Sequence, residues 1–149
     1  MGQAHPQVKW RAGVVRLGDD VAQMTEHDIL VLFGDPVPVA LSTLAVVHSR
    51  GGNQARVPSP SVVPGDLLRV GDQEFRVDEV GELANGNLGD IGHVVIYVDS
   101  PGQPILPGAI KVSAAAGGGV GLRTPAVGEL ICFEAPDEAS GSTGEGAGR

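Results

Sequence analysis

Apolar side chains in this sequence fall in short runs, a pattern that predicts strands rather than long helices. Residues 8–16 alternate between apolar and polar side chains with a period near two, and a turn follows at residues 18–20. The later runs are short and mostly apolar, as in buried strands, and most are flanked by Gly, Asp or Pro. The predicted strands are residues 8–16, 28–33, 44–48, 66–70, 73–77, 93–98, 109–112 and 129–134.

Helix signals are weak by comparison. Residues 39–43 could form one helical turn, and residues 85–88 could open a short helix that Gly86 and Gly89 disfavour. Many short strands with Gly and Pro turns between them predict an all-β fold, a closed or nearly closed barrel of short antiparallel strands. A Pro-Gly turn precedes a strand in residues 63–67 and again in residues 106–110, as a barrel of two intertwined repeats would produce.

The length and composition are those of one folded domain with a tail. The chain has 149 residues, of which 42% are hydrophobic, so it can bury a core. We predict a single β-barrel domain over residues 1–134. Residues 135–149 lack aromatic and branched apolar side chains and are predicted to be a disordered tail. Residues 51–60 and 114–121 are predicted to be mobile loops.

Composition disfavours several classes of function. A net charge of -8 and only five aromatic residues (one Trp, one Tyr and three Phe) argue against nucleic-acid binding. A single cysteine excludes an internal disulfide framework and a Cys-rich zinc site. No apolar run is long enough to span a membrane, and the N-terminus lacks the pattern of a secretory signal. We therefore expect a cytoplasmic protein with no direct membrane insertion.

Motifs for nucleotides, metals and cofactors are missing as well. The glycines of residues 117–121 lack the Lys-Ser/Thr of a phosphate-binding loop, and no two histidines have local metal-ligand spacing. Cys132 lies in an apolar strand pattern and is expected to be a small buried hydrophobic residue. We therefore predict no metal site and no cofactor.

Two of the four histidines, His48 and His93, lie at the ends of predicted strands beside glycine. Each of the two histidines could have a purely structural role, with one ring nitrogen hydrogen-bonded, rather than a functional one. Residues 49–52 read Ser-Arg-Gly-Gly, so backbone N–H groups can converge on an anion there and Arg50 can contact phosphate. An imidazole beside such a loop suits the capture of a phosphoryl group. The candidate residues for binding that group are Ser49, Gly51 and Gly52.

A set of segments, taken in order, has counterparts in a known family. Residues 87–95 read Asn-Leu-Gly-Asp-Ile-Gly-His-Val-Val, similar to a motif Asn-Leu-x-x-Leu-Gly-His-Val. The flanking segments with counterparts are residues 64–67, 77–81, 106–112 and 128–134. In this order the segments resemble the glucitol/sorbitol-specific IIA component of the sugar phosphotransferase system. The resemblance covers residues 7–134 and implies an all-β barrel, in agreement with the strand pattern.

The resemblance also implies roles for single residues. The family's phosphorylated histidine follows an apolar strand, and the matching residue here is His48, in Val46-Val47-His48-Ser49-Arg50-Gly51. Some members carry a second histidine where this chain has Arg50, which could replace it as a fixed cation. His93 is implied as a partner that supports the site or contacts the phosphate.

The family's activity gives the expected function, that of a phosphotransferase with a phosphohistidine intermediate. The histidine phosphocarrier protein would phosphorylate His48, and the group would pass to a cysteine of the sugar-specific IIB component while IIC admits sorbitol (glucitol) or a related polyol. Because both partners approach one imidazole in turn, we expect His48 at the surface. The alternatives are a non-catalytic regulatory or binding module on the same barrel and a purely structural β-domain.

Overall fold

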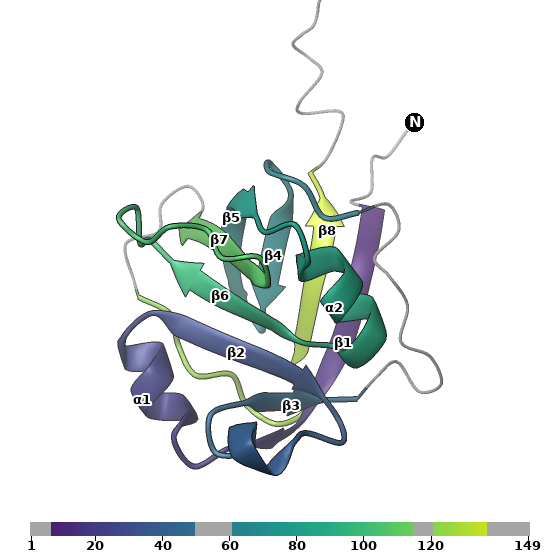
Figure 1. The fold of residues 1–149 in the computed structure, drawn as a ribbon, viewed down its shortest axis with the longest axis vertical. Coiled ribbons are helices and arrows are strands. Elements are labelled where there is room, and N and C mark those ends of the chain that lie inside the picture. The colour runs from purple at the N-terminus through teal and green to yellow at the C-terminus, as the bar shows by residue number, and fades with distance from the viewer. Residues whose placement is uncertain (1–6, 50–60, 115–120, 137–149) are drawn as a thin grey trace, which may run out of the picture.

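Eight strands form the barrel in the computed structural model, which describes residues 7–49, 61–114 and 121–136. They are β1 (Gln7–Leu17), β2 (Ile29–Gly34), β3 (Val46–His48), β4 (Leu67–Val70), β5 (Gln73–Val80), β6 (Val94–Val98), β7 (Ala109–Ala114) and β8 (Leu130–Ala135). Their order around the barrel is β1-β3-β2-β6-β7-β5-β4-β8, and β8 pairs with β1 to close the sheet (Figure 1). The helices of the described ranges are α1 (Val21–Glu26), the 3-10 helix η1 (Val39–Leu41) and α2 (Ala84–Ile91).

The predicted closed all-β barrel is confirmed, and each predicted strand is present. Most pairings are antiparallel, as expected, but β2 pairs with β3, and β6 with β7, in parallel. The short loop Gly71-Asp72 joins β4 to β5, because Gly71 adopts a φ of 60° that other residues rarely adopt. The short helix α1 was not predicted. Its N-cap residue, Asp20, makes no side-chain capping bond, so the local signal for a helix is missing.

The barrel consists of two intertwined repeats, as predicted. Exchanging β1 with β5, β2 with β6, β3 with β7 and β4 with β8 leaves the order of neighbours unchanged. The exchange also carries parallel pairs onto parallel pairs and antiparallel pairs onto antiparallel pairs. Each half has one α-helix at the same point, α1 between β1 and β2 and α2 between β5 and β6.

The two Pro-Gly turns are not equivalent to each other, because they precede β4 and β7, and the repeat does not exchange these two strands. The equivalent turns lie before β4 and β8. Gly65 and Gly128 have φ values of 97° and 96° there, and a carboxylate follows each, on Asp66 and Glu129. Each carboxylate accepts a hydrogen bond from the backbone N–H three residues earlier, at 2.9 and 3.0 Å. The turn therefore depends on glycine and an acid rather than on proline.

The strands β2 and β3 are packed on both faces. Alternate side chains of a strand point to opposite faces, so Leu32 and Val46 join the main core inside the barrel while Phe33 and Val47 point outward. The outward side chains form a second cluster, which Met24 of α1 and the helix η1 cover. This packing holds the C-terminal end of β3, where His48 lies.

Three predicted regions fall mainly outside the described residues: the loops at 51–60 and 114–121 and the tail after Ala135. Ala135 itself ends β8, one residue beyond the predicted strand. Within the described ranges, no helix is long and apolar enough to cross a membrane.

Candidate functional site

His48 is the last residue of β3 and points into one end of the barrel. It lies opposite Val14 of β1 and beside Gly34 of β2. Its ring and the ring of Trp10 form a T-shaped contact, with a centroid distance of 5.1 Å and an interplanar angle of 89°. Trp10 packs in turn against Phe133 of the core. The β1 strand therefore holds the imidazole through an edge-to-face contact.

Both ring nitrogens of His48 face backbone carbonyl groups. Nδ1 lies 2.8 Å from the oxygen of Ser49, and Nε2 lies 2.7 Å from the oxygen of Gly92, just after α2. Each nitrogen donates to its carbonyl when it carries a proton. Gly92 adopts a φ of 68°, and a Cβ there would lie 2.5 Å from Cε1 of His48. Only glycine therefore fits against the imidazole at this position.

The expectation that His48 lies at the surface is wrong for this structure, since the residue is 1% exposed. Two other segments cover the imidazole: Trp10 of β1, and Gly92 at the corner between α2 and β6. A strand-end position in the sequence does not reveal this cover.

His93 lies on the other face of the sheet from His48. Its ring stacks on Phe33 of the outer cluster, with centroids 4.6 Å apart, and its Nδ1 lies 3.0 Å from the carbonyl oxygen of Leu32. These contacts fix the segment Gly92–His93 against β2. The structure thus brings the backbone beside His93, rather than its ring, to the imidazole of His48.

The other predicted site residues are only partly described. Ser49 donates its N–H to Gly13 of β1 at 2.9 Å, which places the residue at the same barrel end as His48. Arg50, Gly51 and Gly52 lie outside the described residues.

A described cation nearby is Arg16, half exposed on β1, whose guanidinium lies 3.8 Å from the carboxylate of Asp35. Asp35 donates its N–H to the carbonyl oxygen of His48 at 2.9 Å. This ion pair is exposed on both sides, so it is expected to contribute little to stability.

Cys132 is buried, as predicted, and is 7% exposed. Burial, followed by a hydrogen bond to the carboxylate of Glu134, raises the pKa of its thiol to about 11. A thiol with so high a pKa is a poor nucleophile at neutral pH. Among the described residues, no group of three or more His, Cys, Asp or Glu side chains is arranged to hold a metal ion.

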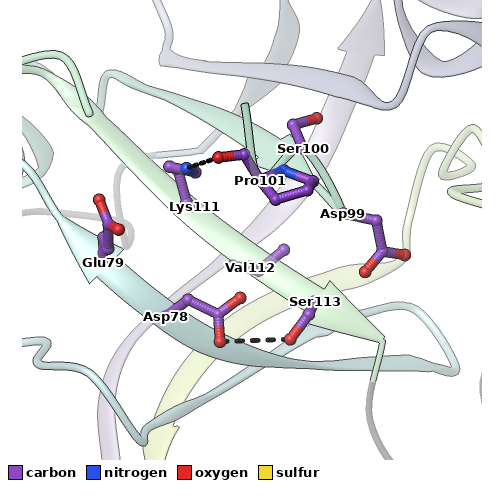
Figure 2. Close-up of a pocket in the computed structure, with 8 residues that line it drawn as sticks. All are labelled: Asp78, Glu79, Asp99, Ser100, Pro101, Lys111, Val112 and Ser113. Atoms are coloured by element: carbon purple, nitrogen blue, oxygen red, sulfur yellow. Dashed lines mark hydrogen bonds between the residues drawn. The ribbon is translucent and has the colours of Figure 1, made fainter. Parts of the chain in front are cut away.

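A surface pocket of about 390 Å³ lies elsewhere, between β5, β7 and the loop after β6 (Figure 2). Its lining residues are Asp78, Glu79, Asp99, Ser100, Pro101, Lys111, Val112 and Ser113. Val112 lies opposite Val77 as His48 lies opposite Val14, so the repeat places valine where the other half has histidine. Lys111 donates to the carbonyl oxygen of Gln103 at 2.6 Å. The pocket therefore contains none of the predicted site residues.

Two residues that contact His48 were not identified from the sequence as part of a site. Trp10 offered no signal beyond being the single tryptophan of the chain. Gly92 did offer one, because it lies in the Asn-Leu-x-x-Leu-Gly-His-Val motif directly before His93.

Known proteins match the chain over most of its length. The family model described as "PTS system glucitol/sorbitol-specific IIA component" matches residues 9–121. Two proteins named "PTS system glucitol/sorbitol-specific EIIA component", from Shigella flexneri and Escherichia coli (strain K12), are each 24% identical over 106 residues, which is 71% of this chain and 82% of each relative.

A solved structure shares the fold. The crystal structure of a phosphotransferase system IIA component from Enterococcus faecalis V583 superposes with a TM-score of 0.67 at 23% sequence identity, over 84% of this chain and 99% of that chain. The family match spans β1 to β7 and includes both His48 and His93. The chain therefore belongs to the glucitol/sorbitol-specific IIA component family of the phosphotransferase system.

Proposed function

We propose that this chain is a phosphoryl carrier that accepts a phosphoryl group from the histidine phosphocarrier protein on His48. It then passes the group to the sugar-specific IIB component, for uptake of sorbitol or a related polyol through IIC. The observation that carries the proposal is the place of His48, at the end of β3 within the segment that matches the IIA family. On this proposal the protein works in the cytoplasm.

The transfer itself is a displacement at phosphorus. A ring nitrogen of His48 attacks the phosphorus of the donor's phosphohistidine, a new N–P bond forms, and the donor's N–P bond breaks. The electron pair of the broken bond returns to the donor's imidazole. Such transfers have a loose transition state, so positioning and nearby charge supply most of the catalysis.

The position of Nδ1 favours Nε2 as the accepting atom. Nδ1 lies next to the histidine's own backbone and against the carbonyl of the adjacent residue, Ser49. A proton on Nδ1 that is donated to this carbonyl would leave the lone pair on Nε2, the nitrogen farther from the backbone. In this proposal Arg50 supplies a cation, and the backbone of Gly51 and Gly52 with Ser49 binds the phosphoryl oxygens.

The test is phosphorylation of the purified full chain by phosphorylated histidine phosphocarrier protein. We expect a mass gain of one phosphoryl group, labile in acid and stable in base, on His48. His48→Gln should abolish labelling, whereas His27→Gln, a change at an exposed histidine, should leave it unchanged. Absence of label on the folded wild-type protein would overturn the proposal, and so would equal labelling of His48→Gln.

The burial of His48 also supports a second candidate, a regulatory or binding module that has kept the barrel without transfer. This candidate predicts capture of phosphotransferase system components by a protein that takes no label. The same labelling experiment therefore separates the two functions.

A further inference from the structure

The imidazole of His48 makes contacts that a nucleophile cannot keep. A carbonyl oxygen only accepts hydrogen bonds, so a carbonyl contact at 2.7 or 2.8 Å is favourable only when the ring nitrogen carries a proton. A nitrogen that carries a proton has no lone pair for attack on phosphorus. The described arrangement of His48 is therefore an unreactive one.

We propose that Gly92 is a positioning residue that caps Nε2 of His48, and that its carbonyl must withdraw before His48 accepts a phosphoryl group. This inference rests on the function proposed above. In the reacting form Nδ1 donates its proton to the carbonyl oxygen of Ser49, and Nε2 presents its lone pair to the donor's phosphorus. Attack, bond breakage and return of the electron pair to the donor follow as described.

Gly92 is suited to this role by its backbone and its lack of a side chain. A Cβ at this residue would lie 2.5 Å from Cε1 and 2.8 Å from Nε2 of His48, and 3.0 Å from the backbone nitrogen of Gly34. Its N–H donates to Leu88 at 3.1 Å, which closes the last turn of α2. Glycine thus allows the carbonyl to approach the ring from the left-handed conformation that ends the helix.

The helix that precedes Gly92 has a low intrinsic helix propensity. α2 has eight residues, and Gly86 and Gly89 within it each lower its helix propensity by about 1 kcal/mol relative to alanine. At its other end Asn85 is tied to the backbone of Val62 by two hydrogen bonds, of 2.8 and 3.1 Å. The N-terminal end is therefore anchored by a side chain, and the core residue Leu88 and the ring of His93 hold the C-terminal end, so the proposal requires only the carbonyl of Gly92 to turn away from the ring.

The first measurement is nuclear magnetic resonance of the ring nitrogens in the unphosphorylated full chain. We expect a protonated Nε2 on His48 whose proton exchanges with solvent at least about tenfold more slowly than the ring protons of the exposed His27, as a buried hydrogen bond requires. Phosphorylation should remove this signal. A bare Nε2 on His48, or exchange as fast as at His27, would overturn the proposal.

The second measurement uses Gly92→Ala with Gly128→Ala as its matched control. Both glycines have positive φ, but a Cβ at Gly128 meets nothing within 4 Å, so this variant carries the backbone strain alone. We expect Gly92→Ala to lose the protected Nε2 signal. We also expect its rate of phosphorylation at saturating donor to fall at least about tenfold, with the half-saturating donor concentration unchanged, because a ring displaced by about 1 Å is misplaced for attack. Equal effects of the two variants would contradict the role of Gly92.

The outcomes for the wild-type protein separate this inference from the function on which it rests. A chain that shows the protected signal but takes no label would overturn the proposed function. A chain that is labelled but lacks the signal would overturn the role of Gly92 alone. Because these results need no variant, they hold even if Gly92→Ala does not fold.

Discussion

Replacing Asp66 by alanine should destabilise the barrel far more than replacing Glu129, although the two carboxylates accept equivalent hydrogen bonds before β4 and β8. The difference is Lys9 of β1. Its Nζ lies 2.6 Å from Oδ2 of Asp66, and the two side chains are only 6% and 3% exposed. Glu129 is partly exposed, and no basic side chain in the described residues forms an ion pair with it. The two turns therefore differ by one buried ion pair.

The expected loss of unfolding free energy follows from the groups that each substitution leaves without a partner. Asp66→Ala leaves the Lys9 ammonium buried with the carbonyl of Ser61, at 3.0 Å, as its remaining partner. Removing one member of a buried ion pair costs about 3–5 kcal/mol of unfolding free energy. Glu129→Ala removes one hydrogen bond at a partly exposed turn, which costs about 1 kcal/mol. The expected difference is a large part of the ~5–15 kcal/mol that stabilises a typical domain.

The assay is urea denaturation of the full-length variants, followed by the fluorescence of the single residue Trp10 and by circular dichroism. If Asp66→Ala is too unstable to purify, Lys9→Met/Asp66→Ala tests the same reasoning, because it removes the uncompensated charge and should recover part of the loss. Equal losses of stability in Asp66→Ala and Glu129→Ala would refute the argument, as would a double variant no more stable than Asp66→Ala.

Three further predictions concern the buried residues Cys132 and Gly81. Native protein at pH 8 should resist alkylation by iodoacetamide, and unfolding in urea should expose Cys132 to it, because the raised thiol pKa of about 11 keeps the buried group protonated; rapid alkylation of folded protein would contradict this. The thiol of the unfolded chain ionises at a lower pH than the buried thiol, so the thiol's contribution to stability should decline as pH rises from about 9 to 11. Urea titrations should therefore show that Cys132→Ala loses less stability than the wild-type protein over this interval. Gly81→Ala should cost about 1–3 kcal/mol or prevent folding, since its Cβ would collide with the backbone of Leu106 and Pro107, whereas Gly102→Ala meets open space and should be neutral in thermal melts.

Local pattern was enough to predict the strands, because each has apolar alternation and most are flanked by turn residues. Local pattern did not predict the parallel pairs, since the direction of a strand relative to its neighbour depends on the path of the connection between them. The connection through η1 returns the chain to the same end of the barrel, so β3 runs parallel to β2. The helix α1 was not predicted either, because Met24 packs it on the outer cluster and no side-chain cap marks its start in the sequence.

The repeat was predicted from the wrong residues. The structure aligns the halves so that Asp35 corresponds to Asp99, and a comparison of the halves along this alignment would also have paired Ala45 with Ala109 and Ser49 with Ser113. The repeated turn needs a glycine with positive φ, and proline precedes this glycine in only one of the two copies.

The candidate histidine was found from sequence, but its surroundings were not. His48 stands out by its place after a strand and before a glycine loop. Its burial depends on Trp10 and Gly92, which are distant from it in the chain and contact the ring in the closed barrel. Sequence shows the strand on which a side chain lies, whereas its exposure is decided by segments that are distant in the sequence.

The pairing of the first strand with the last has a consequence for biosynthesis. β1 pairs with β3 on one side and with β8 on the other, and β4 also pairs with β8. While the chain emerges from the ribosome, the first half therefore lacks neighbours until β8 has been synthesised. We expect the barrel to close only after β8 has emerged, and slowly, as folds dominated by contacts distant in sequence do, with the open edges of β1 and β4 exposed to chaperones until then.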